Sequence, residues 1–222
     1  MIELNGIRKA FNQGRTNELW ALQGIDLEIE ANCVTALRGP SGSGKTTLLT
    51  IIGCLSRPTS GRVRFKDQDI SGLPERFLTQ IRRRSFGFIF QKFNLIRGMS
   101  ALDNVMLPGY PTGEPRTSLR ERAARLLDQF KLDKRRNARV EWLSAGEQQR
   151  VAIARALINN PEVVIADEPT ANLDSALSRE FMGMLESLVA EGRTVLVSSH
   201  DPLVTDSTAV RRVINMRDGK VL

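Results

Sequence analysis

One stretch of the sequence, Gly-Pro-Ser-Gly-Ser-Gly-Lys-Thr at residues 39–46, restricts the possible folds of this chain more than any other. An apolar run at residues 33–37 precedes it, and residues 48–55 place apolar side chains at helical spacing after it. A buried strand that enters a helix through a glycine-rich loop presents backbone N–H groups and the helix N-terminus to an anion. The pattern therefore predicts a phosphate-binding loop between a strand and a helix.

The residues expected to contact the phosphates are the loop and the residue after it: Gly39, Pro40, Ser41, Gly42, Ser43, Gly44, Lys45, Thr46 and Thr47. The Lys45 side chain is expected to place its charge on the β and γ phosphates, and the Thr46 hydroxyl to ligate Mg²⁺. A glycine-rich turn without a ligand is the alternative interpretation. The strand before the loop and the helix after it favour a nucleotide site.

Strand-like and helix-like stretches alternate along the 222 residues, which favours an α/β fold. Apolar runs typical of buried parallel strands occur at residues 86–90, 163–166 and 194–197. The section between the first two of these runs carries helical stripes and a Pro/Gly-rich stretch instead. We expect a single domain over residues 1–222, with an α/β core at 1–91 and 159–222 and an inserted helical subdomain at 92–158.

Local signals predict where several elements begin and end. Two Ser-x-x-acid pairs have the spacing of a capping box, Ser100 with Asp103 and Ser118 with Glu121. A helix over residues 175–191 is expected to stop at Gly192, and the pair Asp218-Gly219 predicts the turn of a final hairpin.

Composition and charge exclude several classes of protein. No run of eighteen apolar residues is present, and the N-terminus has no apolar signal segment, so we expect a soluble, intracellular protein. Two cysteines, Cys33 and Cys54, are too few for a disulfide framework and are expected to be buried and apolar in role. The net charge of +7 is spread over short clusters, which are solvated faces or contacts to a membrane surface or nucleic acid. With aromatic residues at 5%, stacking platforms for single-stranded nucleic acid are poor.

An acidic pair follows the apolar run at residues 163–166. Asp167 is expected to hold Mg²⁺ through its water shell, and Glu168 to polarise a water for attack on the γ-phosphate. Functional groups gather beyond the carboxyl ends of parallel strands, which supports these roles. A simple turn at Asp-Glu-Pro is the alternative, and the nearby phosphate loop makes it weaker.

Two further polar residues follow apolar runs. His200, the one histidine of the chain, is placed to contact the γ-phosphate and to orient the attacking water. Gln91 is placed to bond both Mg²⁺ and that water. Each residue is weak evidence by itself.

A fifth segment, residues 143–147, opens a helix that runs to about Leu157. Ser144 and Glu147 have capping-box spacing, which is a sufficient structural explanation. The same geometry also presents a helix N-terminus, a hydroxyl and the Gly146 amide to an anion. Local physics leaves both roles open.

The order and spacing of these segments resemble the nucleotide-binding domain of ATP-binding cassette (ABC) proteins over essentially the whole chain. By this resemblance the motifs are Walker A at 39–46, the Q-loop at Gln91, the signature at 143–147, Walker B at 163–168, the D-loop at 171–174 and the switch histidine at His200. The resemblance implies a P-loop NTPase (RecA-like) core with an antiparallel β edge and an inserted helical subdomain.

The resemblance also implies an activity and a set of roles. ATP and Mg²⁺ are the expected cofactors, hydrolysis is expected to use Glu168, His200 and Gln91, and the metal is expected on Thr46, Gln91 and Asp167. Phe11 matches the aromatic residue that stacks on adenine. Two domains are expected to enclose two ATP molecules head to tail, with Ser144, Ala145, Gly146 and Glu147 acting in trans and Asp174 communicating between subunits.

Two positions depart from the family pattern. Ala145 replaces the first of two signature glycines, which is tolerable if its φ is negative or the site has room. Phe11 replaces the more common tyrosine, so stacking remains and a hydroxyl is lost.

The stretch at residues 86–108 is most similar to the LolD/MacB/FtsE-like group. This similarity implies a homodimer or paired ATPase half, integral membrane permease subunits, no nucleic acid, and a peripheral location on the cytoplasmic face of the inner membrane. The expected function is transport of the lipoprotein-release or macrolide/toxin-efflux type. The alternatives are an FtsE-like regulator of a cell-wall complex and a soluble ABC ATPase acting on nucleic acid or ribosomes.

Overall fold

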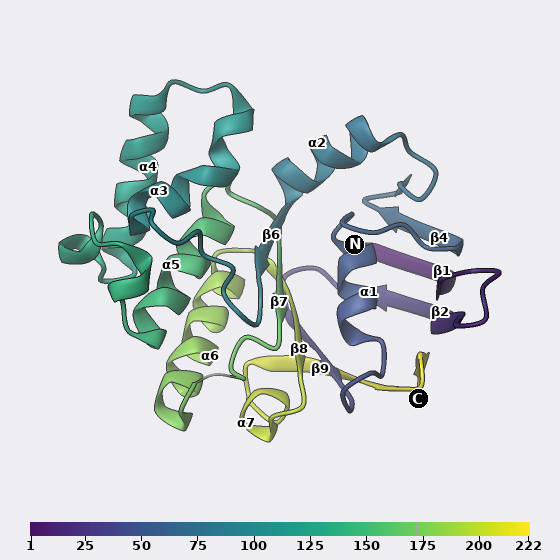
Figure 1. Ribbon diagram of the computed structural model, residues 1–222. Helices are drawn as coiled ribbons and strands as arrows, with labels where there is room; N and C mark the ends of the chain where they lie inside the picture. Colours follow the sequence, from purple (N-terminus) through teal and green to yellow (C-terminus); the bar gives the residue numbers. More distant parts are fainter. Residues whose placement is uncertain (172) are drawn as a thin grey trace.

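The computed structural model describes residues 1–171 and 173–222 and contains two β-sheets with helices around them (Figure 1). The larger sheet has six strands, in the order β10 (Lys220–Val221), β9 (Val210–Arg217), β3 (Val34–Arg38), β8 (Thr194–Ser199), β7 (Val163–Asp167) and β6 (Phe86–Ile89). The strands from β9 to β6 are parallel, and β10 returns antiparallel to β9. The parallel strands therefore end at one edge, where functional groups are expected.

A second, antiparallel sheet lies beside the first and contains β2 (Leu19–Ile29), β1 (Ile2–Phe11), β4 (Ser60–Phe65) and β5 (Gln68–Asp69) in that order. It confirms the antiparallel edge that the resemblance implied. Strand β1 has no counterpart among the local predictions. Its pairing with β2 and β4 shifts register around Gly6, so its side chains do not follow one regular alternation.

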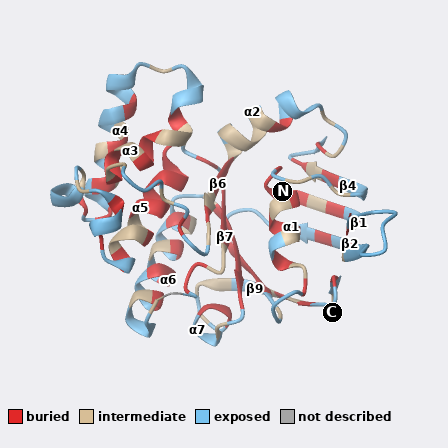
Figure 2. Ribbon diagram, viewed as in Figure 1, coloured by how far each residue is buried: buried red, intermediate tan, exposed pale blue. Residues whose placement is uncertain are grey.

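The larger sheet is buried on both faces by two separate groups of side chains. On one face Leu37, Ile165 and Leu196 pack with residues of α1 (Lys45–Ile52) and of the antiparallel sheet. On the other face Ala36, Ala166 and Val197 share a core with the helices that include α5 (Ala145–Leu157) and α6 (Ser175–Ala190). Figure 2 shows these strands and the inner sides of the helices as buried. Continuous apolar strands are therefore explained by burial on both faces.

The remaining helices are α2 (Glu75–Ser85), α3 (Ala101–Met106), α4 (Arg116–Gln129) and α7 (Pro202–Thr205), with 3₁₀ turns at Leu107–Thr112, Asp133–Arg135 and Val140–Trp142. Helices α3, α4 and α5 gather at one side of the molecule (Figure 1). Their buried side chains join the same core as the strands, so the helical part has no separate core. The boundaries at 91/92 and 158/159 stay a prediction.

The local predictions are confirmed in most places. Ser100 accepts a hydrogen bond from the Asp103 backbone N–H at the start of α3, and α6 ends before Gly192, whose φ is 83°. The final hairpin turns at Asp218 and Gly219, which both have positive φ. Both cysteines are buried and unpaired.

Two local predictions are wrong. Ser118 does not cap a helix, because α4 already begins at Arg116 after Pro115, and proline favours the first turn of a helix. Leu55 lies beyond the end of α1 and is 44% exposed, because the helix stops at Ile52 and Gly53 follows. Within the described residues, none of the helices has the length and apolar character needed to cross a bilayer.

Candidate functional site

A cavity of about 560 Å³ lies where the glycine-rich loop meets the ends of the parallel strands. Several predicted site residues line it: Phe11, Ser41, Gly42, Ser43, Gly44, Lys45, Thr46, Thr47, Gln91, Glu168 and His200. Residues up to 189 positions apart, Phe11 and His200, are thus brought to one site by the sheet order. The same wall contains residues that sequence reasoning missed: Leu19, Trp20, Ala21, Gln23, Asp218 and Gly219.

The loop that joins β3 to α1 requires glycine at two positions for different reasons. Gly44 has a φ of 100°, and a Cβ on it would lie 2.6 Å from the Ala21 carbonyl oxygen. A Cβ on Gly39 would lie 2.2 Å from the Met216 carbonyl oxygen. The loop is therefore enclosed by β2 and β9, and only backbone fits at these contacts.

Lys45 holds a central position in the cavity and is only 6% exposed. Its Nζ donates hydrogen bonds to the carbonyl oxygens of Gly39, at 2.7 Å, and Pro40, at 3.1 Å. It also lies 3.3 Å from Glu168 Oε1. A nearly buried ammonium group needs such partners, because an unpaired buried charge is costly.

The residues present fit a bound phosphate chain. Gly44 at the start of α1 supplies no side-chain cap, so the first backbone N–H groups of the helix have no side-chain acceptor at that residue. The Ser43 hydroxyl is buried and has no hydrogen-bond partner. Uncapped helix N–H groups, a cation and an unpartnered hydroxyl around one loop form an anion-binding site.

The residues present also fit a divalent cation beside that chain. The Thr46 hydroxyl lies 3.0 Å and 2.9 Å from the two carboxylate oxygens of Asp167. Hydroxyl and carboxylate oxygens suit Mg²⁺, which keeps several waters and needs few protein ligands. Among the described residues there is no cluster of three or more His, Cys, Asp or Glu that could hold a metal ion.

Glu168 lies between Lys45 and His200, directly after β7. Its Oε2 is 3.0 Å from Nδ1 of His200, and its Oε1 faces Lys45. The Glu168 backbone has a φ of 44°, an uncommon conformation for a residue with a side chain. The backbone therefore turns the carboxylate back toward the glycine-rich loop instead of continuing the strand.

The far end of the cavity is apolar. Phe11 is 44% exposed there, and the Lys9 ammonium lies 5.4 Å from its ring centre. Trp20, paired with Ala10 across β1 and β2, is 38% exposed and lines the same cavity. Trp20 thus adds a second aromatic side chain to the cavity wall, one that the sequence analysis did not include.

A family model described as ABC transporter matches residues 22–171 of this chain. The chain belongs to the ABC transporter family. The resemblance proposed from the motifs is thus confirmed, together with the P-loop fold and the domain's character as an ATPase.

Two relatives place the chain within the ABC family. The macrolide export ATP-binding/permease protein MacB of Hyphomonas neptunium is 44% identical over 222 residues, covering 100% of this chain and 34% of the relative. The pyoverdine export ATP-binding/permease protein PvdT of Pseudomonas fluorescens is 43% identical, again covering 100% of this chain and 34% of the relative. The chain therefore spans about a third of the length of the curated relatives it matches, and the predicted similarity to the group that includes MacB is confirmed.

Solved ABC cassettes share the fold. A dimeric post-hydrolysis state of the cassette MJ0796 bound to ADP and Pi has a TM-score of 0.89 and 40% identity, covering 100% of this chain and 96% of that chain. The structure of cbiO1 from Clostridium perfringens has a TM-score of 0.86 and 29% identity, covering 100% and 86%.

The ABC signature lies on α5, and its residues do not line the cavity described above. Ser144 caps the helix, accepting from the Glu147 backbone N–H, while the Glu147 carboxylate accepts from the Ser144 N–H at 2.8 Å. This reciprocal bond holds the pKa of Glu147 below its usual range, with the Arg135 guanidinium adding to the effect. Gly146 is buried, and a Cβ there would lie 2.9 Å from a methyl group of Leu177 in α6.

The ABC D-loop is described in part. Asp174 caps α6, accepting from the backbone N–H groups of Ala176 and Leu177, both at 2.9 Å. Asn172, which the sequence placed in the same loop, lies outside the described residues.

Proposed function

We propose that this chain hydrolyses ATP as the motor domain of an export system, closing as a dimer on ATP and driving a membrane permease. The observation that carries the proposal is the single cavity in which the glycine-rich loop, Lys45, Glu168, His200 and Gln91 meet. Phosphoryl transfer depends on positioning and charge stabilisation, and this set of groups supplies both.

We assign roles to the residues in and beside the cavity, and the contacts described above support them. Lys45 and the N–H groups of α1 bind the phosphates, while Phe11 and Trp20 receive the base. Thr46, Asp167 and Gln91 would hold Mg²⁺, which would supply charge neutralisation for the phosphates. Glu168 accepts a proton from the attacking water, and His200, 3.0 Å from its carboxylate, orients both.

The signature residues complete the site from a second copy of the domain. The cavity wall of the same chain does not include the signature residues Ser144, Ala145, Gly146 and Glu147. We propose that they contact the nucleotide bound by the second copy. The N-terminus of α5 supplies a positive dipole end for the γ-phosphate of the partner's nucleotide. The dimeric state of MJ0796 supports this arrangement. We assign to Asp174, in the D-loop, a role in connecting the two halves.

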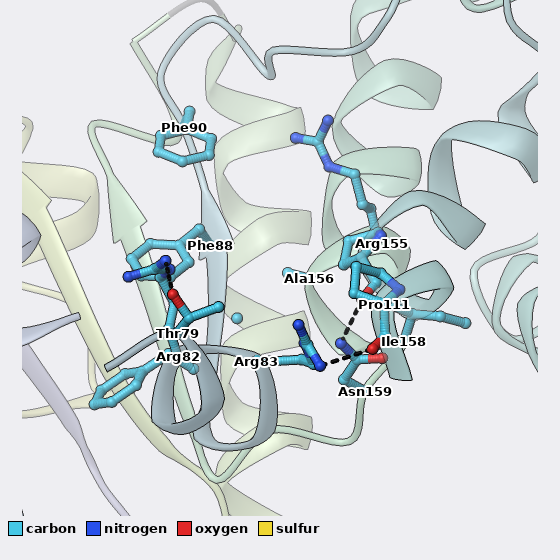
Figure 3. Close-up of a pocket in the computed structure, with 13 residues that line it drawn as sticks. Thr79, Arg82, Arg83, Phe88, Phe90, Pro111, Arg155, Ala156, Ile158 and Asn159 are labelled. Carbon is cyan, nitrogen blue, oxygen red and sulfur yellow. Dashed lines mark hydrogen bonds between the residues drawn. The ribbon is translucent and has the colours of Figure 1, made fainter. Parts of the chain in front are cut away.

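A groove of about 300 Å³ between α2, β6 and the start of the helical part is the proposed contact for the permease. Figure 3 shows Phe88 and Phe90 on one wall and Arg155, Pro111 and Asn159 on the other. Arg83 crosses its floor and donates to the Pro111 carbonyl oxygen at 2.7 Å. Phe93, close in sequence to Phe90, is 7% exposed and does not line the groove.

The names of MacB and PvdT, each an export ATP-binding/permease protein, support a permease partner and a place at the cytoplasmic face of the inner membrane. They also support export of a small molecule over regulation of a cell-wall complex. We propose no nucleic-acid partner, since aromatic residues at 5% leave little stacking surface.

The decisive experiment compares Glu168→Gln with Lys45→Ala. Glu168→Gln removes the proton acceptor and keeps the shape, so we expect tight ATP binding, an ATP-dependent dimer and hydrolysis lowered by about a hundredfold or more. Lys45→Ala removes the buried cation and is expected to abolish binding of a fluorescent ATP analogue. Phosphate release and size-exclusion chromatography give the readouts. Near-wild-type turnover of Glu168→Gln removes Glu168 from its role, and micromolar binding by Lys45→Ala contradicts the phosphate site.

A further inference from the structure

Ser198 is brought against the acidic pair by the register of two parallel strands. Ser198 in β8 is paired with Asp167 in β7. Two residues earlier on each strand, Leu196 and Ile165 pack on the face that α1 covers. Because side chains alternate along a strand, Ser198 and Asp167 point to this same face, where Thr46 lies.

The Ser198 hydroxyl makes two hydrogen bonds, and both join it to the acidic pair of Asp167 and Glu168. The Ser198 Oγ donates to Asp167 Oδ1 at 2.6 Å. The same oxygen accepts from the Glu168 backbone N–H at 3.0 Å, and this N–H also donates to the Ser198 carbonyl oxygen at 3.1 Å. Ser198 is 0% exposed, so water does not compete for either bond.

The two bonds act on the two features that the acidic pair needs. The first helps to hold the Asp167 carboxylate in place, together with the Thr46 hydroxyl, which bonds the same group. The second helps to hold Glu168 at its φ of 44°, the conformation that directs its carboxylate to Lys45 and His200. An uncommon backbone conformation persists only where surrounding contacts determine it.

We propose that Ser198 is a positioning residue that couples the metal-binding carboxylate of Asp167 to the backbone of Glu168. One buried hydroxyl thereby contributes to holding the proposed Mg²⁺ ligand and the proposed proton acceptor in place relative to each other. Groups that orient a metal ligand through a hydrogen bond affect metal affinity and activity strongly. This inference rests on the roles proposed above for Asp167 and Glu168.

A purely structural role for Ser198 predicts a different experimental result. Loss of a buried hydroxyl that only stabilises the sheet lowers the thermal stability and leaves the Mg²⁺ requirement unchanged. Loss of a positioning hydroxyl raises the Mg²⁺ concentration needed for nucleotide binding. The Mg²⁺ dependence therefore separates the two roles.

The experiment titrates Mg²⁺ at fixed fluorescent ATP analogue and measures binding, with phosphate release in parallel. For Ser198→Ala we expect a half-saturating Mg²⁺ concentration about tenfold higher, with nucleotide binding in EDTA unchanged. Ser198→Thr keeps the hydroxyl and is expected to restore the wild-type Mg²⁺ dependence. Thr35→Val is the matched control, because Thr35 is buried in β3 and its hydroxyl has no hydrogen-bond partner.

Asp167→Asn, measured alongside, separates failure of the inference from failure of the proposed function. If Asp167→Asn leaves the Mg²⁺ dependence unchanged, the role proposed for Asp167 is wrong. If Asp167→Asn raises the half-saturating Mg²⁺ concentration and Ser198→Ala matches wild type, the role of Asp167 stands and the inference about Ser198 is overturned. An equal shift in Thr35→Val and Ser198→Ala also overturns it, since any buried hydroxyl would then suffice.

Discussion

Ala145 occupies a position where the family resemblance led us to expect glycine, and the structure accommodates its methyl group. It is the first residue of α5, its φ is not positive, and its side chain is exposed. Neither backbone strain nor a clash therefore opposes the methyl group. Gly146 differs, because a Cβ there would meet Leu177 at 2.9 Å.

We predict that Ala145→Gly changes ATP hydrolysis by less than tenfold. The substitution removes an exposed methyl group and costs roughly 1 kcal/mol or less of helix stability. Steady-state phosphate release is the measurement. A tenfold rise in turnover would show that the methyl group hinders closure and would contradict this account.

At the scale of an element, the start of α5 contributes both to the stability of the helix and to the proposed function. The capping box of Ser144 and Glu147 stabilises the helix, and the same N-terminus is the surface proposed to face the partner's nucleotide. A cap that satisfies the helix internally keeps this surface ordered before any ligand arrives. Structure and proposed function therefore use the same residues.

The lowered pKa of Glu147 gives a testable pH dependence. A carboxylate with a lowered folded-state pKa stabilises the fold above its unfolded-state pKa and loses this contribution as the pH falls through the folded-state pKa. Glu147→Gln is therefore expected to lower the free energy of unfolding at pH 7 by roughly 0.5 kcal/mol, and the difference from wild type should close in acid. Urea denaturation across pH measures it.

Glu186→Gln, an exposed carboxylate on α6, is the control for the general effect of removing one negative charge. The explanation through the capping box fails if Glu147→Gln and Glu186→Gln show the same pH dependence.

At the scale of the whole molecule, β6 joins the candidate nucleotide cavity to the groove proposed as the permease contact. The strand carries Phe86 and Phe88 in the groove and ends just before Gln91, which lines the nucleotide cavity. A movement of this short connection therefore reaches both sites. The arrangement gives a physical route between nucleotide occupancy and the proposed partner.

We predict that Arg83→Glu weakens co-purification with the permease by at least about tenfold while ATP binding stays unchanged, because like charges or a lost cation at an interface cost several kcal/mol. Arg211→Glu is the control, since Arg211 lies on β9 toward the opposite edge of the larger sheet. The measurement is capture of partners from detergent-solubilised membranes by ATP-trapped Glu168→Gln protein with and without the second change. Equal recovery of the permease with both charge reversals would place its contact elsewhere.

The sequence by itself determined the parts of this protein that depend on neighbours along the chain. The glycine-rich loop, the apolar strands, the caps at Ser100 and Ser144 and the final turn are local patterns, and local sterics and hydrogen bonds specify them. The order of the motifs was sufficient to indicate the family. Even the misplaced start of α4 was a local error, because Pro115 competes with Ser118 as a starting point.

Only the tertiary structure decided which distant residues meet. The contact between Ser198 and Asp167 spans 31 positions and depends on the register of β7 against β8. Trp20 reaches the cavity because β2 lies beside the loop, as the contact of Gly44 with Ala21 shows. Strand register is set by packing on both faces of a sheet at once, and no stretch of sequence contains that information by itself.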